Sequence, residues 1–326
     1  MSWWAIAADR IARGETALLV TICTVKGSAP RELGARMLVW ADGQDGTIGG
    51  GTLEFTVVEQ ARRMLETKVP WRFQNYPLGP LLGQCCGGNV GLLLERLDAA
   101  GWLAQVAAAE AKARDYMIVS RLGADGIEKQ VVEATGNGDA VTVQYGAATV
   151  TQRIGEGAVI TERIEARPRL LMFGAGHVGQ ALAPIAATLP FHLNWFDTRP
   201  EFAGPGVTLS DDPIAAVKAA PPGAFALIFT QSHALDYDLA HAVLVRGDFA
   251  YCGLIGSATK RARFEKRLLA DGIAPVALAG LVCPIGEIGL TSKVPQVMAV
   301  AIAAELMLVW EKAKAGAMPA RTQHVV

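Results

Sequence analysis

Residues 170–190 read LLMFGAGHVGQALAPIAATLP, and this stretch decides how the second half of the chain folds. Its leading apolar residues indicate a buried strand, and the segment from Gly176 to Thr188 has the composition of a buried helix. Glycines fill the turn between them, where side chains would block a tight bend and the close approach of a phosphate. Backbone N–H groups at the start of the helix would attract that anion. The candidate cofactor-binding residues here are Gly174, Gly176, His177 and Gly179.

Strands and helices continue to alternate after this turn, which is typical of parallel βαβ units with helices on both faces of the sheet. Asp197 ends the next expected strand, 21 residues past Gly176, where an acidic residue can hold a ribose 2′-hydroxyl. We therefore predict a Rossmann-like, doubly wound parallel sheet. The glycine turn itself could also serve only to pack the helix on the strand. The expected strands are Leu170–Phe173, His192–Asp197, Phe225–Thr230 and Tyr251–Ile255, with helices at Gly176–Thr188, near Leu235–Val245 and from about Ser257.

Two polar loops follow later strands of this sheet, at the edge where doubly wound folds bind ligands. His233, with Asp236 and Asp238 close behind it, suggests a metal or cofactor contact, although a polar loop that caps the next helix is the more common explanation. Ser257 opens a segment that could bind a phosphate or could equally cap a helix with a basic face. We take His233 and Ser257 as candidate cofactor contacts.

The first half of the chain predicts a separate α/β module at residues 1–100. In Thr52–Thr67 apolar residues recur at helical spacing. A middle segment, residues 101–165, combines an Ala-rich helix with short alternating stretches, and Glu165–Arg169 looks like a linker to a Rossmann-like domain at 166–326. The other expected elements are helices at Trp3–Arg13 and Trp102–Arg114 and strands at Ala17–Val25, Ala35–Trp40, Val90–Leu97 and Ala140–Tyr145.

A second glycine-rich loop, GQCCGG at residues 83–88, carries adjacent cysteines. Zinc sites usually space such ligands two to four residues apart, and neighbouring Cα atoms, about 3.8 Å apart, are too close for an unstrained disulfide. Flanking glycines leave the thiols accessible, which suits soft metal–sulfur chemistry or persulfidation. Alternatively, the two cysteines act only as small hydrophobic side chains buried in the core. The candidates here are Gln84, Cys85, Cys86, Gly87 and Gly88.

A third candidate region consists of two glycine-containing segments, GSAPR at residues 27–31 and GTIGGG at residues 46–51. Three glycines ahead of a helix, Gly49, Gly50 and Gly51, can form a concavity of N–H groups for an anion. Arg31 and Arg36 could add charge-assisted contacts to a phosphate. A glycine hairpin without any ligand is the alternative.

Composition narrows the class of protein. The chain has 326 residues, of which 51% are hydrophobic and 19% charged, and a formal net charge of −1. These values indicate a globular chain of about two domains. Nucleic acids and anionic membranes both require clustered Lys and Arg, so we expect neither as the main partner.

Five cysteines without a CxxC pair argue against a disulfide framework and for a reducing compartment. The start of the chain, Met1–Arg13, lacks the pattern of a secretory signal. Leu170–Phe191 has no charged residue and is long enough to span a bilayer, but its glycines and prolines fit a strand, a turn and a buried helix better. We expect a soluble, cytoplasmic protein.

Together these segments resemble the XdhC/CoxI family. GSAPRELGARMLV, DGTIGGGTLE and LGQCCGG are similar to its N-terminal module. FGAGHVGQALA, TQSHALDYDL, GLIGSATKR and CPIG…KVPQVMAVAIAAEL are similar to its C-terminal Rossmann module. The resemblance spans nearly the whole chain except residues 101–165. Lys293 and Pro295, before an Ala/Val-rich helix, resemble the xanthine dehydrogenase branch of the family rather than the carbon monoxide dehydrogenase branch.

This resemblance implies an accessory protein and not an enzyme. Such a protein binds molybdenum cofactor in its molybdopterin form, protects it during sulfuration by a cysteine desulfurase and inserts it into apo-xanthine dehydrogenase. It also implies that Cys85 and Cys86 contact molybdenum or its sulfur. We further expect a homodimer.

Two other functions remain open from the residues alone. The Rossmann motif and Asp197 favour an oxidoreductase that uses NAD(P), but no acid–base pair that would assist hydride transfer can be placed. Alternatively, the Rossmann half senses a nucleotide and regulates assembly of the molybdoenzyme.

Overall fold

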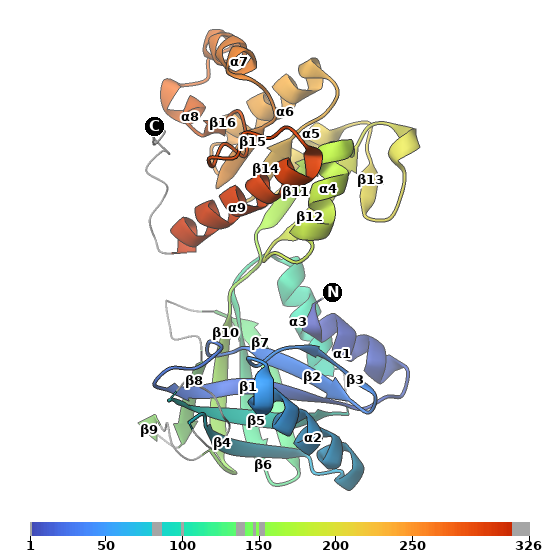
Figure 1. The fold of residues 1–326 in the computed structure, drawn as a ribbon, viewed down its shortest axis with the longest axis vertical. Coiled ribbons are helices and arrows are strands. Elements are labelled where there is room, and N and C mark those ends of the chain that lie inside the picture. The colour runs from blue at the N-terminus through green and yellow to red at the C-terminus, as the bar shows by residue number, and fades with distance from the viewer. Residues whose placement is uncertain are drawn as a thin grey trace. The chain divides into compact units, whose positions relative to one another are not determined.

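The computed structural model describes residues 2–79, 87–98, 101–134, 141–145, 148–149 and 154–314. The chain forms two compact units, Met1–Ala166 and Arg167–Val326 (Figure 1). We refer to them as the N-terminal unit and the C-terminal unit. The division between them falls within Glu165–Arg169, the segment that resembles a linker.

The N-terminal unit contains an antiparallel five-stranded sheet in the order β3-β2-β1-β5-β4. Helix α2 (Gly51–Thr67) covers one face of it, because Leu53, Val57 and Ala61 recur along one side of the helix and are completely buried against the strands. The helix predicted from this spacing is thereby confirmed. The strands are β1 (Ala17–Lys26), β2 (Arg36–Trp40), β3 (Gly43–Gly46), β4 (Trp71–Pro77) and β5 (Asn89–Leu97).

A second antiparallel sheet, in the order β7-β6-β10-β8-β9, packs against the first. Cys23 and Leu93 of the first sheet share a buried apolar cluster with Ile160 of the second. The described part of residues 101–165 therefore forms a layer of the N-terminal unit. Its elements are α3 (Gly101–Ala111), β6 (Tyr116–Gly123), β7 (Gly126–Glu133), β8 (Val141–Tyr145), β9 (Ala148–Thr149) and β10 (Ala158–Ile164), with α1 (Trp3–Ala12) packed beside α3.

Two buried ion pairs join these sheets. Lys129 on β7 lies 2.9 Å from Glu95 on β5, and each side chain is only 3% exposed. Arg36 on β2 pairs with Glu162 on β10. Removing one partner would leave an uncompensated charge in the interior, so the contact between the sheets depends on both members of each pair.

The C-terminal unit is built on a six-stranded sheet in the order β13-β12-β11-β14-β15-β16, in which every pairing is parallel. The order reverses between β11 and β14, and doubly wound folds bind ligands beside such a reversal. The predicted Rossmann-like sheet is confirmed. Its strands are β11 (Arg169–Phe173), β12 (His192–Asp197), β13 (Val207–Leu209), β14 (Phe225–Ile228), β15 (Tyr251–Leu254) and β16 (Leu281–Val282).

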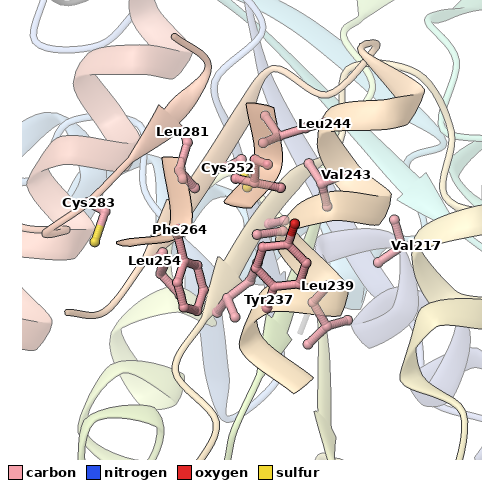
Figure 2. Packing of buried hydrophobic residues seen from close by; sticks show 14 of the residues in the cluster. Val217, Tyr237, Leu239, Val243, Leu244, Cys252, Leu254, Phe264, Leu281 and Cys283 are labelled. Carbon is pink, nitrogen blue, oxygen red and sulfur yellow. The ribbon is translucent and has the colours of Figure 1, made fainter. Parts of the chain in front are cut away.

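Helices cover both faces of this sheet, which explains why its strands are apolar without alternation. Leu170 and Met172 pack with α4 and α9, whereas Leu171 and Phe173 belong to the cluster on the opposite face. Figure 2 shows that second cluster, in which Tyr237 and Phe264 of the helices lie beside strand residues such as Leu254. The helices are α4 (His177–Ala186), α5 (Pro213–Ala219), α6 (His233–Arg246), α7 (Ala258–Ala270), α8 (Pro275–Leu278) and α9 (Pro295–Lys314), with a 3₁₀ turn η2 (Pro200–Phe202).

The uncharged stretch Leu170–Phe191 is divided between β11 and α4, as the sequence predicts. Helix α4 continues through Pro184. Across the part of the chain that the structure describes, no helix has both the length and the apolar character that crossing a membrane requires.

Candidate functional site

The glycine turn between β11 and α4 has a closely packed side and an open side. A Cβ on Gly174, whose φ is +117°, would lie 2.4 Å from the carbonyl oxygen of Phe229, and one on Gly179 would lie 2.3 Å from the carbonyl oxygen of Gly174. A Cβ on Gly176 would meet no described atom within 4 Å, and the neighbouring His177 is exposed. Gly176 is the N-cap residue of α4, and because it has no side chain it makes no capping hydrogen bond to the first N–H groups of the helix. The turn thus leaves room for a phosphate at the helix N-terminus.

Asp197 lies at the end of β12, as predicted, but its carboxylate is already fully engaged. Oδ1 accepts hydrogen bonds from N and Nε of Arg199, both at 2.9 Å. Oδ2 accepts from Nη2 of Arg199 at 2.8 Å and from N of Ala175 at 2.6 Å. Burial opposes ionisation of Asp197, but these bonds outweigh it and hold its pKa below the ordinary value. Arg199 therefore occupies the acceptor that was expected for a ribose hydroxyl.

A small pocket of about 40 Å³ lies at this edge of the sheet, between the ends of β11, β12 and β14. Part of its lining is apolar, including Phe173 and Leu239, and its polar residues, which we call the rim, come from the end of β12 and from the loops after β12 and β14. Nη1 of Arg199 crosses this rim and donates to Oε1 of Gln231 at 3.3 Å. The rim residues are Asp197, Thr198, Arg199, Thr230, Gln231 and Ser232.

His233 and Ser257 lie at the starts of helices α6 and α7. The cap of α6 is Ser232, and its side chain accepts a hydrogen bond from N of Leu235, while the exposed His233 ring lies 3.2 Å from a guanidinium nitrogen of Arg263. Ser257 caps α7 by accepting from N of Lys260. Both loops thus have the capping role that the sequence offered as an alternative to ligand binding.

The acids near His233 are not arranged around it. Asp236 is completely buried, where Oδ1 accepts from N and Oγ1 of Thr230 and Oδ2 accepts from Nζ of Lys260 at 2.6 Å. Asp238 is exposed. Within the described residues, no group of three or more His, Cys, Asp and Glu side chains is placed to hold a metal ion.

The glycine-rich segments of the N-terminal unit converge in space. A Cβ on Gly88 would lie 2.1 Å from the carbonyl oxygen of Ser28, and one on Gly27 would lie 3.2 Å from Cα of Gly88. A Cβ on Gly49 would lie 2.4 Å from the ring of Pro30. Gly88 and the segment of Gly27 and Ser28, far apart in sequence, are thus packed backbone to backbone, and Gly49 lies against the ring of Pro30, so a side chain at Gly88 or Gly49 would prevent this approach. Gln84, Cys85 and Cys86, which precede Gly87 in sequence, lie outside the described residues.

An acidic side chain of the chain itself fills the glycine concavity ahead of α2. Oε2 of Glu54 accepts hydrogen bonds from N of Ile48 and N of Gly50, both at 3.1 Å, and from Oγ1 of Thr47. The N–H of Gly49 donates to Thr47. Burial opposes ionisation of Glu54, but these bonds lower its pKa overall. A ligand phosphate would have to displace this carboxylate, whereas Gly51 at the first position of α2 remains exposed.

The two arginines of this region differ in availability. Arg36 bonds Glu162 and the carbonyl oxygen of Gly34, and its side chain is 11% exposed, so it is committed to the packing of the two sheets. Arg31 is paired with its exposed neighbour Glu32 and lies beside Gly49. Exposed pairs of this kind are weak, which leaves Arg31 the better candidate to meet an anion.

The three described cysteines, Cys23, Cys252 and Cys283, are buried and free. Burial raises the pKa of Cys252 to about 12 and that of Cys283 to about 11. The pKa of Cys23 is raised as well, mainly by burial. These thiols stay protonated at neutral pH and are poor metal ligands, because it is the thiolate that binds.

Sequence patterns did not reveal Glu54 or Arg199. Each had a usable signal: Glu54 lies in the first turn of a helix that follows three glycines, where a carboxylate is favoured. Arg199 stands two residues beyond the acid expected at the ribose position. A charged side chain that close to a predicted anion or ribose site competes with the ligand for it.

Two family models match the chain. One, described as the XdhC Rossmann domain, matches residues 170–306, and the other, described as the XdhC and CoxI family, matches residues 10–76. The chain belongs to the XdhC and CoxI family. The first match includes the glycine turn and Asp197, and the second includes GSAPR and GTIGGG, whereas GQCCGG at residues 83–88 lies beyond both matches.

Two relatives are similar over most of this XdhC-family chain. The uncharacterized protein YqeB of Escherichia coli K12 is 28% identical over 313 residues, which are 92% of this chain but 44% of that protein. This chain therefore spans less than half the length of YqeB. A protein of Bacillus subtilis 168, described as a probable xanthine dehydrogenase subunit, is 26% identical over 90% of this chain and 93% of its own length.

A solved structure has the same fold. The crystal structure described as a xanthine dehydrogenase from Bacillus halodurans matches with a TM-score of 0.72 over 98% of each chain, at 22% identity. The match covers both units, so the fold of the N-terminal unit is shared with that structure as well as the Rossmann-like fold of the C-terminal unit.

Proposed function

We propose that this XdhC-family protein is an accessory protein of xanthine dehydrogenase that binds molybdenum cofactor in its molybdopterin form, protects it during sulfuration by a cysteine desulfurase and inserts it into the apoenzyme. The observation that carries this proposal is the convergence in the N-terminal unit. Gly88, which closely follows Cys85 and Cys86, packs directly on Gly27 and Ser28. In sequence, Cys86 and Cys85 stand two and three residues before this packed glycine.

The residues at this convergence fit such a cofactor. A Cβ on Gly87 would meet no atom of the described residues within 4 Å, so the backbone beside the packed glycines is open to a ligand there. The N–H of Gly50 is bonded to Glu54, and a phosphate would have to displace that carboxylate to reach it. Arg31 supplies a positive charge for a phosphate. When bound, molybdenum cofactor brings a soft metal–sulfur head and a phosphate. Cys85 and Cys86 would hold the first, and Arg31 with the open glycine backbone would hold the second.

We expect the protein to show no turnover by itself and to activate apo-xanthine dehydrogenase stoichiometrically. A carrier delivers one cofactor per encounter, so the activity gained should saturate near one equivalent per active site. The measurement is a titration of cofactor-free xanthine dehydrogenase with cofactor-loaded protein. Activity that kept growing at a trace of this protein, without another cofactor source, would contradict a carrier and indicate a catalyst.

Replacement of both vicinal cysteines, Cys85→Ala with Cys86→Ala, is expected to reduce retained molybdenum at least about tenfold. Two soft ligands are lost, and each tenfold change in affinity corresponds to about 1.4 kcal/mol. Molybdenum and released pterin are measured in protein purified from cells that make the cofactor. Cys252→Ala is the control, because it removes a buried thiol from the C-terminal unit and should leave retention unchanged. If the folded double variant retained as much molybdenum as the unchanged protein, the two cysteines would serve only in packing and not in cofactor binding.

A further inference from the structure

The pocket at the ends of β12 and β14 carries an inference that goes beyond cofactor delivery. Its distinctive feature is that Arg199 holds the acid at the ribose position. A carboxylate has about four acceptor sites, and the two oxygens of Asp197 receive four hydrogen bonds, three of them from Arg199. A neutral ribose diol could bond Asp197 only by displacing the guanidinium.

We propose that Arg199 is a specificity-determining residue of this pocket: it excludes a dinucleotide whose ribose presents free hydroxyls at the end of β12, and it favours one whose ribose carries a 2′-phosphate there. The ligand class is therefore NADP(H) rather than NAD(H).

The orientation of the guanidinium supports this choice. Nε and Nη2 are directed at Asp197, while Nη1 extends across the rim of the pocket to Gln231. A phosphate can therefore accept from the Nη1 side while Asp197 keeps the guanidinium in place, and arginine is well suited to such bonds. The ring of Phe202, 3.9 Å from the guanidinium carbon, further limits its movement.

The size and lining of the pocket point the same way. Its volume of about 40 Å³ has room for a few water molecules, and so for a group the size of a phosphate. Thr198, Gln231 and Ser232 contribute hydroxyl and amide groups that can donate to phosphate oxygens. The charged residues of the lining are Asp197 and Arg199, and the first is already neutralised by the second.

The glycine turn completes the requirements for a dinucleotide. The pyrophosphate would lie at the open position of Gly176, where no described side chain bonds the first N–H groups of α4. The GAGHVG turn joins β11 to α4 as a dinucleotide-binding motif does. The turn and Arg199 lie on the same sheet edge, because N of Ala175 within the turn donates to the carboxylate that Arg199 holds.

The test compares two ligands that differ only in the 2′-phosphate. Calorimetric titration of the full-length protein at low salt should give a Kd for NADP⁺ at least about tenfold lower than for NAD⁺, since a hydrogen bond to a charged group changes affinity by roughly this factor or more. The preference should shrink as salt is added. Equal or tighter binding of NAD⁺, or no detectable binding of NADP⁺, would overturn the proposal.

A substitution then assigns the preference to this residue. Arg199→Ser should reverse it, because Asp197 is freed for ribose hydroxyls and repels a phosphate. Arg199→Lys should keep a weakened preference for NADP⁺, since lysine retains the positive charge but lacks the planar set of guanidinium donors. This variant still tests the assignment if Arg199→Ser fails to fold. Arg267→Ala, an exposed arginine of α7 outside the pocket, should leave the ratio of the two affinities unchanged. An unchanged ratio in both Arg199 variants would refute the assignment.

This inference stands or falls separately from cofactor delivery. Arg199 lies in the C-terminal unit, whereas Cys85 and Cys86 lie in the N-terminal unit. If the protein retained molybdenum but bound neither NAD⁺ nor NADP⁺, the proposed function would stand and the inference about Arg199 would fail.

Discussion

Asp236→Ala is expected to destabilise the C-terminal unit by about 3 to 5 kcal/mol, which is the usual cost of removing one partner of a buried ion pair. The carboxylate is completely buried and bonds Nζ of Lys260 at 2.6 Å. Without it, the Lys260 ammonium, whose side chain is 10% exposed, keeps only the carbonyl oxygen of Ile255 as a hydrogen-bond acceptor within the described residues. Thr230 loses two hydrogen bonds as well. Hydrogen exchange of peptides from residues 225–268 in increasing urea measures the loss.

Two comparisons separate the ion pair from a general effect of truncation. Asp238→Ala, two residues further on α6 and exposed, should cost less than about 1 kcal/mol. Asp236→Ala combined with Lys260→Met should be more stable than Asp236→Ala alone, because the unpaired charge is then gone. A cost below about 1 kcal/mol for Asp236→Ala alone would show that the pair contributes little.

Alanine substitutions at Gly179 and Gly176, both in the GAGHVG motif, should differ strongly in their effect on the stability of the C-terminal unit. Gly179→Ala is expected to destabilise the C-terminal unit by about 3 kcal/mol or more, because its Cβ would lie 2.3 Å from the backbone oxygen of Gly174 and backbone yields only by separating α4 from β11. Gly176→Ala should change stability by less than about 1 kcal/mol, since its φ is −71° and its Cβ has room, so that the gain from a stiffer chain and the loss of a better N-cap residue nearly offset each other. Urea unfolding, followed by the same exchange method for residues 170–190, compares the two.

For ligand binding, in contrast to stability, Gly176 should be the sensitive position. A branched side chain in Gly176→Val stands where a phosphate would approach, so it should weaken binding of NADP⁺ while the protein stays folded. If Gly176→Val unfolded the unit as severely as Gly179→Ala, the open face of the turn would be structural and not a ligand site.

Both halves of the protein use the same arrangement at their candidate sites. Glu54 accepts from the N–H groups of the concavity before α2, and Arg199 donates to the acid at the end of β12. In each case a charged side chain of the chain itself makes the contact that was expected for a ligand. These internal contacts remove the cost of leaving buried polar groups unpaired, and they restrict which ligands can compete.

Local patterns predicted much of the fold. Strand β12 was expected at His192–Asp197 and is observed there, and α2 differs from its predicted start by one residue. These elements are buried on a continuous face, so their hydrophobic spacing reports their structure directly. Strand β4 (Trp71–Pro77) was not expected, because it is a sheet edge with polar and exposed positions, and its pairing with β5 comes from distant residues.

Short runs of adjacent residues were enough to predict the Rossmann-like half, the start of α4 within one residue and the family resemblance. Contacts between distant residues were needed to find that strands β6 to β10 form a second sheet packed on the first, and that Gly88 lies against Ser28. The tertiary structure also decided the roles of charged side chains: Arg36 pairs with Glu162 rather than with a ligand, and Asp197 is held by Arg199. The physical reason is that a glycine motif specifies where backbone N–H groups and open space lie, whereas the partner of each buried charge is chosen by whichever opposite charge the fold brings within hydrogen-bond distance.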